Sequence, residues 1–532
     1  MNKVREIGGK LEKAAVVSVL LLCICIFWGL TYYSAGYTMM ERAMDTRDNA
    51  ALNLFILAAV TAAALGLHGG LHSGRLASVR RRILAWKPYI IGILSLFICV
   101  ISMVWVVNSH VAPGGDGGPL CGVAERMVTG NYIDMKPKYH MAIFPHQFGL
   151  LSVIHLIFSL FGAWHYEVFQ YLNALCMPLL FYSGYKFLEI ICDTAEVILY
   201  YAVFFLGCLP MFLYVPFVYG EIMSITFTMV LMWQVLRYCR TGRRSCFVWG
   251  TAAIVLACIV RKNSLILLIA AGIVLAVHSV KKASLWGIAW FLVMALAVSG
   301  SDRLIQAHYE KVSGIEVAGG VPYISWVRMG LQDSWAGPGW FDNTSIEVYK
   351  EHGYDTELTA AAERERLGEM LEEMWEDKAS AVDFFRRKIL SQWNAPEYSS
   401  VVETKQFDCE LQELRGFARR IYYENDPAVW AYMDRYQFLL YFYAAVSAVL
   451  LFADRKRGRC LAEYILYIAI VGGFLFSAVW ESSSRYVIPY VVYMIPLAAV
   501  GMCLLTRLLA EKIPGRTFLR KIFSKSDIKK AA

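Results

Sequence analysis

The chain has 532 residues, of which 58% are hydrophobic and 18% are charged, and its mean hydropathy is +0.47. Soluble domains are about 45–50% apolar and about 25% charged, so the composition excludes a soluble globular protein and predicts a polytopic membrane protein. The net charge of +8 does not indicate a nucleic-acid partner, because Lys and Arg gather in short loops between apolar runs. The 13 cysteines lie mostly within apolar runs, and no spacing of Cys or His indicates a metal.

Apolar runs divide the chain into membrane spans. A crossing needs about 20 residues, and we predict about twelve transmembrane helices, several of them shorter than this. The basic N-terminus leads into an apolar run without a small-residue cleavage site, so we expect a retained first helix. The predicted spans are 14–35, 51–68, 89–108, 168–188, 197–215, 221–239, 246–260, 264–280, 284–300, 436–453, 461–480 and 486–508.

The distribution of Lys and Arg predicts the orientation. Basic residues cluster at the N-terminus, in four loops (75–87, 237–244, 281–282 and 455–459) and in the tail after Arg507, which places both termini in the cytoplasm of a multi-pass cell-membrane protein. The loop 109–167 is then external. Four apolar runs (147–162, 168–188, 197–215 and 221–239) lie between Asp116 and the basic loop 237–244, where an odd number of crossings is needed. We therefore expect the shortest run, 147–162, to lie in the outer interface instead of crossing.

The long hydrophilic stretch 301–435 is external by the same reasoning. Apolar residues recur at helical spacing around Leu367 and Met374, which predicts an amphipathic helix over about 355–393 that stops before Pro396. The fold class is therefore all-α. Its expected parts are an N-terminal hairpin and basic loop (1–88), a transmembrane core with the loop 109–167 (89–300), an external soluble segment (301–435), C-terminal helices (436–510) and a basic tail (511–532) that binds anionic lipid or a partner.

Asp116 and Glu221 are candidate catalytic carboxylates on the outer side. Asp116 lies between two glycine pairs, which permit a ligand to approach closely. It is either a general base for an incoming hydroxyl or a loop residue beside turn-forming glycines. Glu221 begins an apolar span, where a carboxylate is favoured by the helix dipole, and it is otherwise a second carboxylate of the same cavity.

Cations at the outer ends of spans are candidate phosphate ligands. Arg261 and Lys262, followed by Asn263, stand where short external loops usually lack positive charge, and Arg485 lies at the outer end of a later span beside Tyr486. The alternative is that these side chains reach toward lipid headgroups.

The remaining candidates lie in the external loop. His140 and His146 have no third ligand at a suitable spacing, so we expect hydrogen-bonding roles for them and for Tyr139, and no metal.

In their order, these residues resemble the glycosyltransferase C superfamily of membrane enzymes. The similarity is to the bacterial branch that contains protein mannosyltransferases and aminoarabinose lipid A transferases (glycosyltransferase family 39-like), and it runs from about residue 89 onward. One departure is that Gly117 follows Asp116, where many members have Gln or Glu. The matching positions are Asp116, Ala124, Gly130, Tyr139, Pro145-His146-Gln147 with Gly149, Phe161-Gly162, Glu221, Arg261-Lys262-Asn263, and the stretches that begin at Trp326, Lys388 and Ser483.

The resemblance implies an enzyme of the EC 2.4 class that uses no cofactor. Its donor would be a sugar on a polyprenyl phosphate, and its acceptor a hydroxyl of an external glycan, lipid or protein. Asp116 would be the general base of an inverting transfer. Arg261, Lys262 and Arg485 would stabilise the lipid phosphate that leaves, and Tyr139, His140, His146, Asn263 and Tyr486 would contact substrate.

Two other functions remain open at this point. A transporter or flippase of lipid-linked sugars would also need a lipid groove and outer arginines, but it would not need an external base such as Asp116. It would often contain inverted repeats, and none is clear in this sequence. A non-catalytic scaffold of envelope assembly would tolerate the loss of both Asp116 and Arg485.

Overall fold

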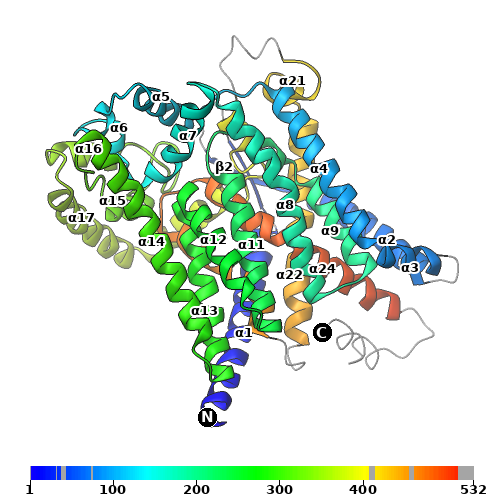
Figure 1. Ribbon diagram of the computed structural model, residues 1–532. Helices are drawn as coiled ribbons and strands as arrows, with labels where there is room; N and C mark the ends of the chain where they lie inside the picture. Colours follow the sequence, from blue (N-terminus) through cyan, green and yellow to red (C-terminus); the bar gives the residue numbers. More distant parts are fainter. Residues whose placement is uncertain are drawn as a thin grey trace.

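The computed structural model describes residues 2–31, 33–37, 43–72, 76–405, 414–454 and 460–512. Ten helices in these ranges are long and apolar enough to cross a membrane, which confirms the polytopic helical fold (Figure 1). They are α1 (Asn2–Leu30), α2 (Ala50–His72), α4 (Lys87–Ser109), α8 (Glu167–Ile191), α11 (Glu221–Thr241), α13 (Leu265–Lys282), α14 (Trp286–Ser313), α22 (Pro427–Ala453), α23 (Ile465–Val479) and α24 (Ile488–Lys512). The spans that contain α13 and α23 include the turn before each helix and begin at Lys262 and Leu461.

Two further predicted spans form shorter apolar helices, α9 (Ala195–Gly207) and α12 (Ser245–Val260). The run predicted over 197–215 breaks after α9, since Pro210 opens the separate helix α10 (Leu209–Leu213). The prediction of about twelve spans therefore corresponds to ten long helices and these two short ones.

Several boundaries differ from the prediction. The helix predicted to end at residue 300 continues to Ser313, so the first residues of the segment 301–435 extend a membrane helix. The single helix predicted over 355–393 is two helices, α17 (Thr356–Glu376) and α18 (Lys378–Trp393). Asp377 separates them, because its side chain accepts a hydrogen bond from the backbone of Ser380 and so caps α18. The basic loop 455–459 and the tail after Lys512 lie outside the described residues.

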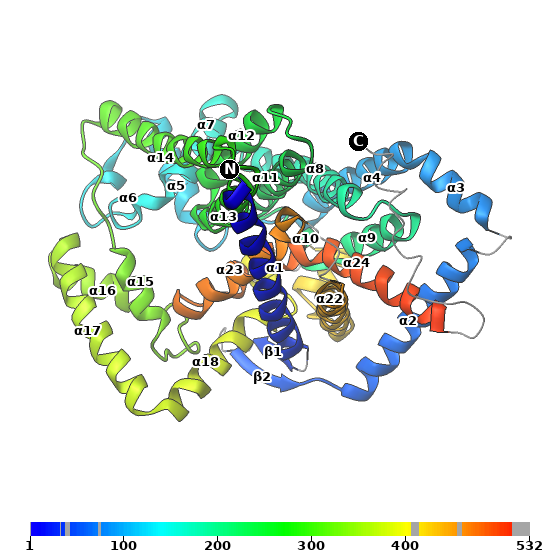
Figure 2. The same cartoon turned by 90° about the horizontal axis from the view of Figure 1, so that it is seen from below.

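The described residues also include one short antiparallel pair of strands between α1 and α2, within a chain that is otherwise helical. Its strands are β1 (Tyr33–Tyr37) and β2 (Ala43–Arg47), paired with Tyr33 opposite Arg47. The end of α1 is held by Asn394, which follows α18 and donates hydrogen bonds to the carbonyl oxygens of Leu30 (2.8 Å) and Tyr33. Figure 2 shows β1, β2 and α18 side by side.

The helices differ in how deeply they pack. α11, α23 and α24 are mostly buried within the protein, whereas α2 and α14 bury few residues and lie at the periphery. The contact between α22 and α24 is close enough that a Cβ atom on Gly501 would lie 1.9 Å from the carbonyl oxygen of Tyr443. The inner helices form the scaffold on which the loops at one end are built.

Short helices gather at that end of the bundle. The loop 109–167 contains α5 (Gly117–Val128), α6 (His140–Ile143) and α7 (Phe148–Phe161), and the chain bends by 99° between Ile133–Ile143 and Pro145–Phe161. Helix α7 has 14 residues, fewer than a crossing needs. The chain that leads into α15 (Tyr323–Gly330) meets the end of α6, where the backbone N–H of Val321 donates to the carbonyl oxygen of Ile143, and α16 (Thr344–Glu351) follows α15.

A buried ion pair joins two helices within the segment 301–435. Arg328 on α15 donates to both carboxylate oxygens of Glu363 on α17, at 2.6 and 3.2 Å, and both side chains are buried. This fork geometry fixes α15, and with it Trp326. Trp326 stacks on Phe341, with ring centroids 6.3 Å apart.

We expect Gly149→Ala to lower the stability of the protein by about 1–3 kcal/mol, the usual cost of inserting a methyl group into a packed contact. A Cβ atom at this position would lie 2.2 Å from the carbonyl oxygen of Ile259, so α7 and α12 would have to separate. The measurement is the thermal unfolding midpoint in detergent. Gly92→Ala on α4 is the matched control, since nothing lies within 4 Å of its added Cβ atom. An equal response of the two variants would contradict the close contact.

Candidate active site

A cavity of about 510 Å³ lies where the loop 109–167 meets the ends of α12 and α23 and the segment 301–435. Its wall combines charged groups with a broad aromatic surface. The charged groups come from four separate parts of the chain. The aromatic residues of the wall are Phe144, Tyr219, Tyr323, Trp326, Trp340, Phe341, Trp480 and Tyr486.

Asp116 lies at the cavity between two glycine positions, Gly115 and Gly117, that have no room for a side chain. It immediately precedes α5. A Cβ atom on Gly117 would lie 2.5 Å from the carbonyl oxygen of Val218, and one on Gly115 would lie 2.6 Å from a carboxylate oxygen of Glu403. Gly115 also has a φ of +50°, which favours glycine. The glycines that flank Asp116 therefore allow the loop to approach both the core and the segment 301–435, while the Asp116 side chain keeps 44% of its surface exposed.

Arg485 is the cation at the centre of the site. It lies in the short turn Ser484–Tyr486 that leads into α24, and it is buried. Its Nη2 donates to Oδ2 of Asp116 at 3.0 Å, and its Nη1 lies 3.2 Å from Oε1 of Glu403. Its Nε lies 3.7 Å from Oε1 of Glu221. One guanidinium group thus contacts carboxylates from three distant segments.

Arg261 and Glu221 form a second, deeper ion pair. Arg261 follows the end of α12, Glu221 begins α11, and Nη1 of Arg261 donates to Oε1 of Glu221. Glu221 is only 1% exposed and does not line the cavity. Among the described residues, Nη2 of Arg261 and Oε2 of Glu221 are buried and make no hydrogen bond. The spare donor of Arg261 can therefore serve a ligand oxygen.

Two tyrosines hold the arginines in place. The guanidinium of Arg485 lies 5.1 Å from the ring centre of Tyr219 and 5.7 Å from that of Tyr486, and Arg261 lies 5.9 and 5.4 Å from the same two rings. These are distances at which a cation is attracted to an aromatic face. Tyr219 is itself fixed by Gln147, whose side chain also contacts Nε2 of His140 at 2.8 Å.

The carboxyl groups of the site have pKa values displaced in opposite directions. Burial would raise the pKa of Asp116, but the adjacent charge and hydrogen bond of Arg485 lower it below the ordinary value. Burial raises the pKa of Glu481 to about 7, although Arg485 opposes this rise. Asp116 is thus ionised at neutral pH, whereas Glu481 titrates there.

The structure gathers most of the predicted site residues. Tyr139 is 43% exposed and does not line the cavity, and His140 contacts Gln147 behind the wall. Lys262 lines the cavity and is paired with Asp302. The predicted residues in the cavity wall are Asp116, His146, Arg261, Lys262, Asn263, Arg485 and Tyr486.

Sequence reasoning missed Glu403 and Glu481. Glu403 lies in α19 (Ser400–Thr404). The sequence around it has no pattern that indicates a functional residue, and its contact with Arg485 arises from the fold. Glu481 stands four residues before Arg485, in the same motif, so proximity in the sequence was a usable signal. The single group in the described part of the chain that has three metal-ligating side chains close together lies elsewhere, on α2 and α9.

Comparisons with known proteins give a limited result. No protein-family model matches the sequence, and no curated protein sequence does. The archaeal oligosaccharyltransferase AglB from Archaeoglobus fulgidus, in complex with an inhibitory peptide and a dolichol-phosphate, is similar in structure, with 12% identity and a TM-score of 0.42 over 82% of this chain and 53% of that one. The apo form of the oligosaccharyltransferase from this organism gives 14% identity and a TM-score of 0.40 over 82% and 54%. The chain spans about half the length of these structures.

The ion pair between Asp116 and Arg485 predicts a stability difference that depends on pH. Because the folded pKa of Asp116 lies below its ordinary value of 3.8, the wild-type carboxylate stabilises the fold above that value, and this contribution is lost as pH falls through the folded pKa. Unfolding midpoints of wild type and Asp116→Asn, measured from pH 7 down to pH 3, should differ by a constant amount near neutrality. Below pH 3.8, the ordinary pKa of an aspartate, the wild type should lose stability relative to Asp116→Asn. A pH-independent difference would contradict the lowered pKa.

Proposed function

We propose that the protein is a membrane glycosyltransferase of the glycosyltransferase C type, which moves a sugar from a polyprenyl-phosphate donor to a hydroxyl of an external acceptor. The observation that carries this proposal is one cavity that holds an accessible carboxylate, Asp116, beside two buried guanidinium groups, Arg261 and Arg485. A transfer from a lipid phosphate needs both kinds of group, a base for the acceptor and cations for the phosphate. The orientation, with the cavity on the outer face and both termini in the cytoplasm, is part of the proposal.

In the proposed reaction the acceptor oxygen attacks the anomeric carbon from the side opposite the phosphate. The new carbon–oxygen bond forms as the bond to the phosphate oxygen breaks, and the configuration inverts. The hydroxyl proton passes to Asp116. The donor is a phosphodiester with one negative charge, and the departing lipid phosphate gains a second, which Arg261 and Arg485 stabilise. The spare Nη2 of Arg261 is the donor that a phosphate oxygen would meet.

Glu221 is better described as a positioning residue than as a second catalytic carboxylate. It is buried behind Arg261, it contacts both arginines, and it does not line the cavity. Its negative charge reduces the cost of burying two guanidinium groups side by side. We therefore assign direct contact with substrate to Asp116 and the arginines.

The ion pair also affects the strength of the base. Arg485 lowers the pKa of Asp116, which makes this carboxylate a weaker base while the two side chains are paired. A donor phosphate that attracts Arg485 weakens the contact with Asp116 and raises its basicity when the acceptor is to be deprotonated. Charge on the donor thus couples its binding to activation of the base.

The experiment that tests this function is turnover in proteoliposomes. Wild type and Asp116→Asn are given a panel of polyprenyl-phosphate sugars with envelope extract as the acceptor, and release of free polyprenyl phosphate is measured. We expect release by wild type, and a loss of at least 100-fold in Asp116→Asn with donor binding retained, since base catalysis contributes about 10²–10⁴-fold.

Glu125→Gln is the matched control, because this carboxylate also lies on α5 but does not line the cavity. It should release lipid phosphate at the wild-type rate. Equal release by wild type and Asp116→Asn would remove Asp116 as the base. Movement of the lipid between leaflets without any release would identify a flippase instead.

The role of Arg485 in tuning Asp116 predicts a shift of the pH–activity profile. In Arg485→Gln the charge and the hydrogen bond that most strongly oppose the effect of burial on Asp116 are removed, so the pKa of this carboxyl should rise. The acidic limb of kcat/KM should therefore move to higher pH, in addition to a loss of rate. The same experiment on Lys262→Gln should lower the rate without this displacement, since Lys262 pairs with Asp302. An unmoved limb in Arg485→Gln would refute the coupling.

A further inference from the structure

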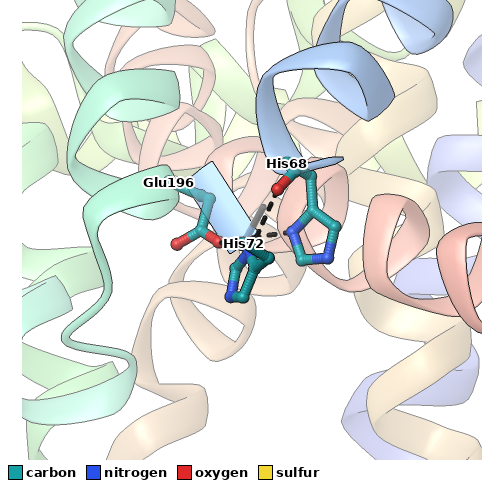
Figure 3. Close-up of side chains that lie close together, drawn as sticks. All are labelled: His68, His72 and Glu196. Carbon is teal, nitrogen blue, oxygen red and sulfur yellow. Dashed lines mark hydrogen bonds and ion pairs between the residues drawn. The ribbon is translucent and has the colours of Figure 1, made fainter. Parts of the chain in front are cut away.

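Two histidines and one glutamate lie together at the far end of α4 from Asp116. His68 and His72 occupy the last turns of α2, and Glu196 lies in the first turn of α9 (Figure 3). Lys87, at the start of α4, contacts Asp193 just before α9, whereas the loop with Asp116 follows the end of α4 at Ser109. This group, which we call the His–Glu cluster, is therefore separated from the cavity by the length of a membrane helix.

The spacing of the ligand atoms matches a transition-metal site. Oε1 of Glu196 lies 3.3 Å from Nδ1 of His68 and 3.3 Å from Nδ1 of His72. A tetrahedral ion with N and O ligands at about 2.0–2.2 Å separates neighbouring ligand atoms by about 3.3–3.6 Å. One ligand atom from each of the three side chains lies within 4.8 Å of the others. Histidines four residues apart face the same side of a helix, so α2 presents both rings to Glu196.

Two buried polar atoms of the cluster lack a hydrogen bond of suitable geometry within the described part of the protein. Glu196 is 2% exposed, and its Oε1 makes no hydrogen bond of suitable geometry with any described residue. The same holds for Nδ1 of His68. Buried polar atoms in folded proteins are nearly always paired with protein, water or an ion. Oε1 of Glu196 and Nδ1 of His68 therefore lie close together, and one ion bound to both atoms would satisfy them.

The donor atoms indicate which kind of ion fits. The cluster offers two imidazole nitrogens and one carboxylate oxygen. Hard cations such as Ca²⁺ and Mg²⁺ depend on several oxygen ligands and do not suit it. Imidazole ligands suit zinc and its neighbours in the first transition row.

We infer that His68, His72 and Glu196 bind one divalent transition metal ion of the Zn²⁺ type, with water in the remaining position. His72 is 39% exposed, which gives the ion a path from solvent. Its Nδ1 now lies 3.0 Å from the carbonyl oxygen of His68, so its ring turns when the ion binds.

The bound ion would join a loosely packed helix to the core. Of its 23 residues, α2 buries only Asn53, Ala64 and Leu71. Its other contacts include single hydrogen bonds, among them Thr61 with Tyr443 at 2.8 Å and Tyr200 with the carbonyl oxygen of Ala64 at 3.1 Å. Ligands from both α2 and α9 make the ion a clamp between them, and an ion that binds only the folded state raises stability.

The test uses the full chain, purified without a polyhistidine tag and stripped of metal by a chelator. Calorimetric titration with Zn²⁺ should give one ion per chain, Co²⁺ should give the intense visible absorption of tetrahedral coordination, and Zn²⁺ should raise the unfolding midpoint. His68→Gln, His72→Gln and Glu196→Gln should each weaken binding by at least 10-fold. His72→Gln alters the most exposed ligand, so it keeps the test decisive if Glu196→Gln fails to fold.

Two control variants separate this site from other ligands in the chain. Cys460→Ser removes the thiol that contacts Cys239 and His278, and His155→Gln removes a ring that contacts Tyr309. Both should bind Zn²⁺ as the wild type does. Absence of binding by wild type, unchanged binding by the three ligand variants, or loss of binding in Cys460→Ser would overturn the proposal. In that case the His–Glu cluster forms ion pairs only.

Discussion

The site depends on the burial of two arginines that cannot give up their charge. A buried guanidinium is stable only when carboxylates and hydrogen bonds surround it, and Arg485 and Arg261 obtain these from Asp116, Glu221 and Glu403. These partners come from the first large loop, the start of α11 and the segment 301–435. The requirement for charge balance thus adds to the buried apolar contacts that bring the same parts of the chain together. Tyr219 and Tyr486 pack beside both guanidinium groups, and the glycines next to Asp116 leave room for the loop to approach them.

The membrane architecture was predictable because lipid imposes it locally. A span must satisfy its own backbone, so each appears in the sequence as a long apolar run, and ten of the predicted runs are long helices at nearly the predicted positions. The failures lie where local sequence does not decide. Asp377 interrupts the helix predicted over 355–393 by capping α18, and the hairpin of β1 and β2 lies in a short stretch with no marked alternation.

The candidate site was predictable to the extent that its charges stand out against apolar surroundings. Arg261 and Arg485 were recognisable because a cation at the end of an apolar span is costly. Glu403 was not, since it is one acidic residue among many in a hydrophilic segment, and its significance is its 3.2 Å distance from Arg485. Glu221 was recognisable as a candidate, but its depth behind the arginines follows from packing that the sequence does not record.

The pairing of Asp116 with Arg485 joins residues 369 positions apart, and this separation has a consequence for biosynthesis. A chain that enters the membrane from its N-terminus exposes Asp116 with the early helices, whereas Arg485 is made only just before α24. Until the chain has been made as far as the turn before α24, the carboxylate has no counterion from Arg485 and the cavity lacks this part of its wall. A nascent or C-terminally truncated chain therefore contains the early residues of the candidate site without the ion pair that assembles it.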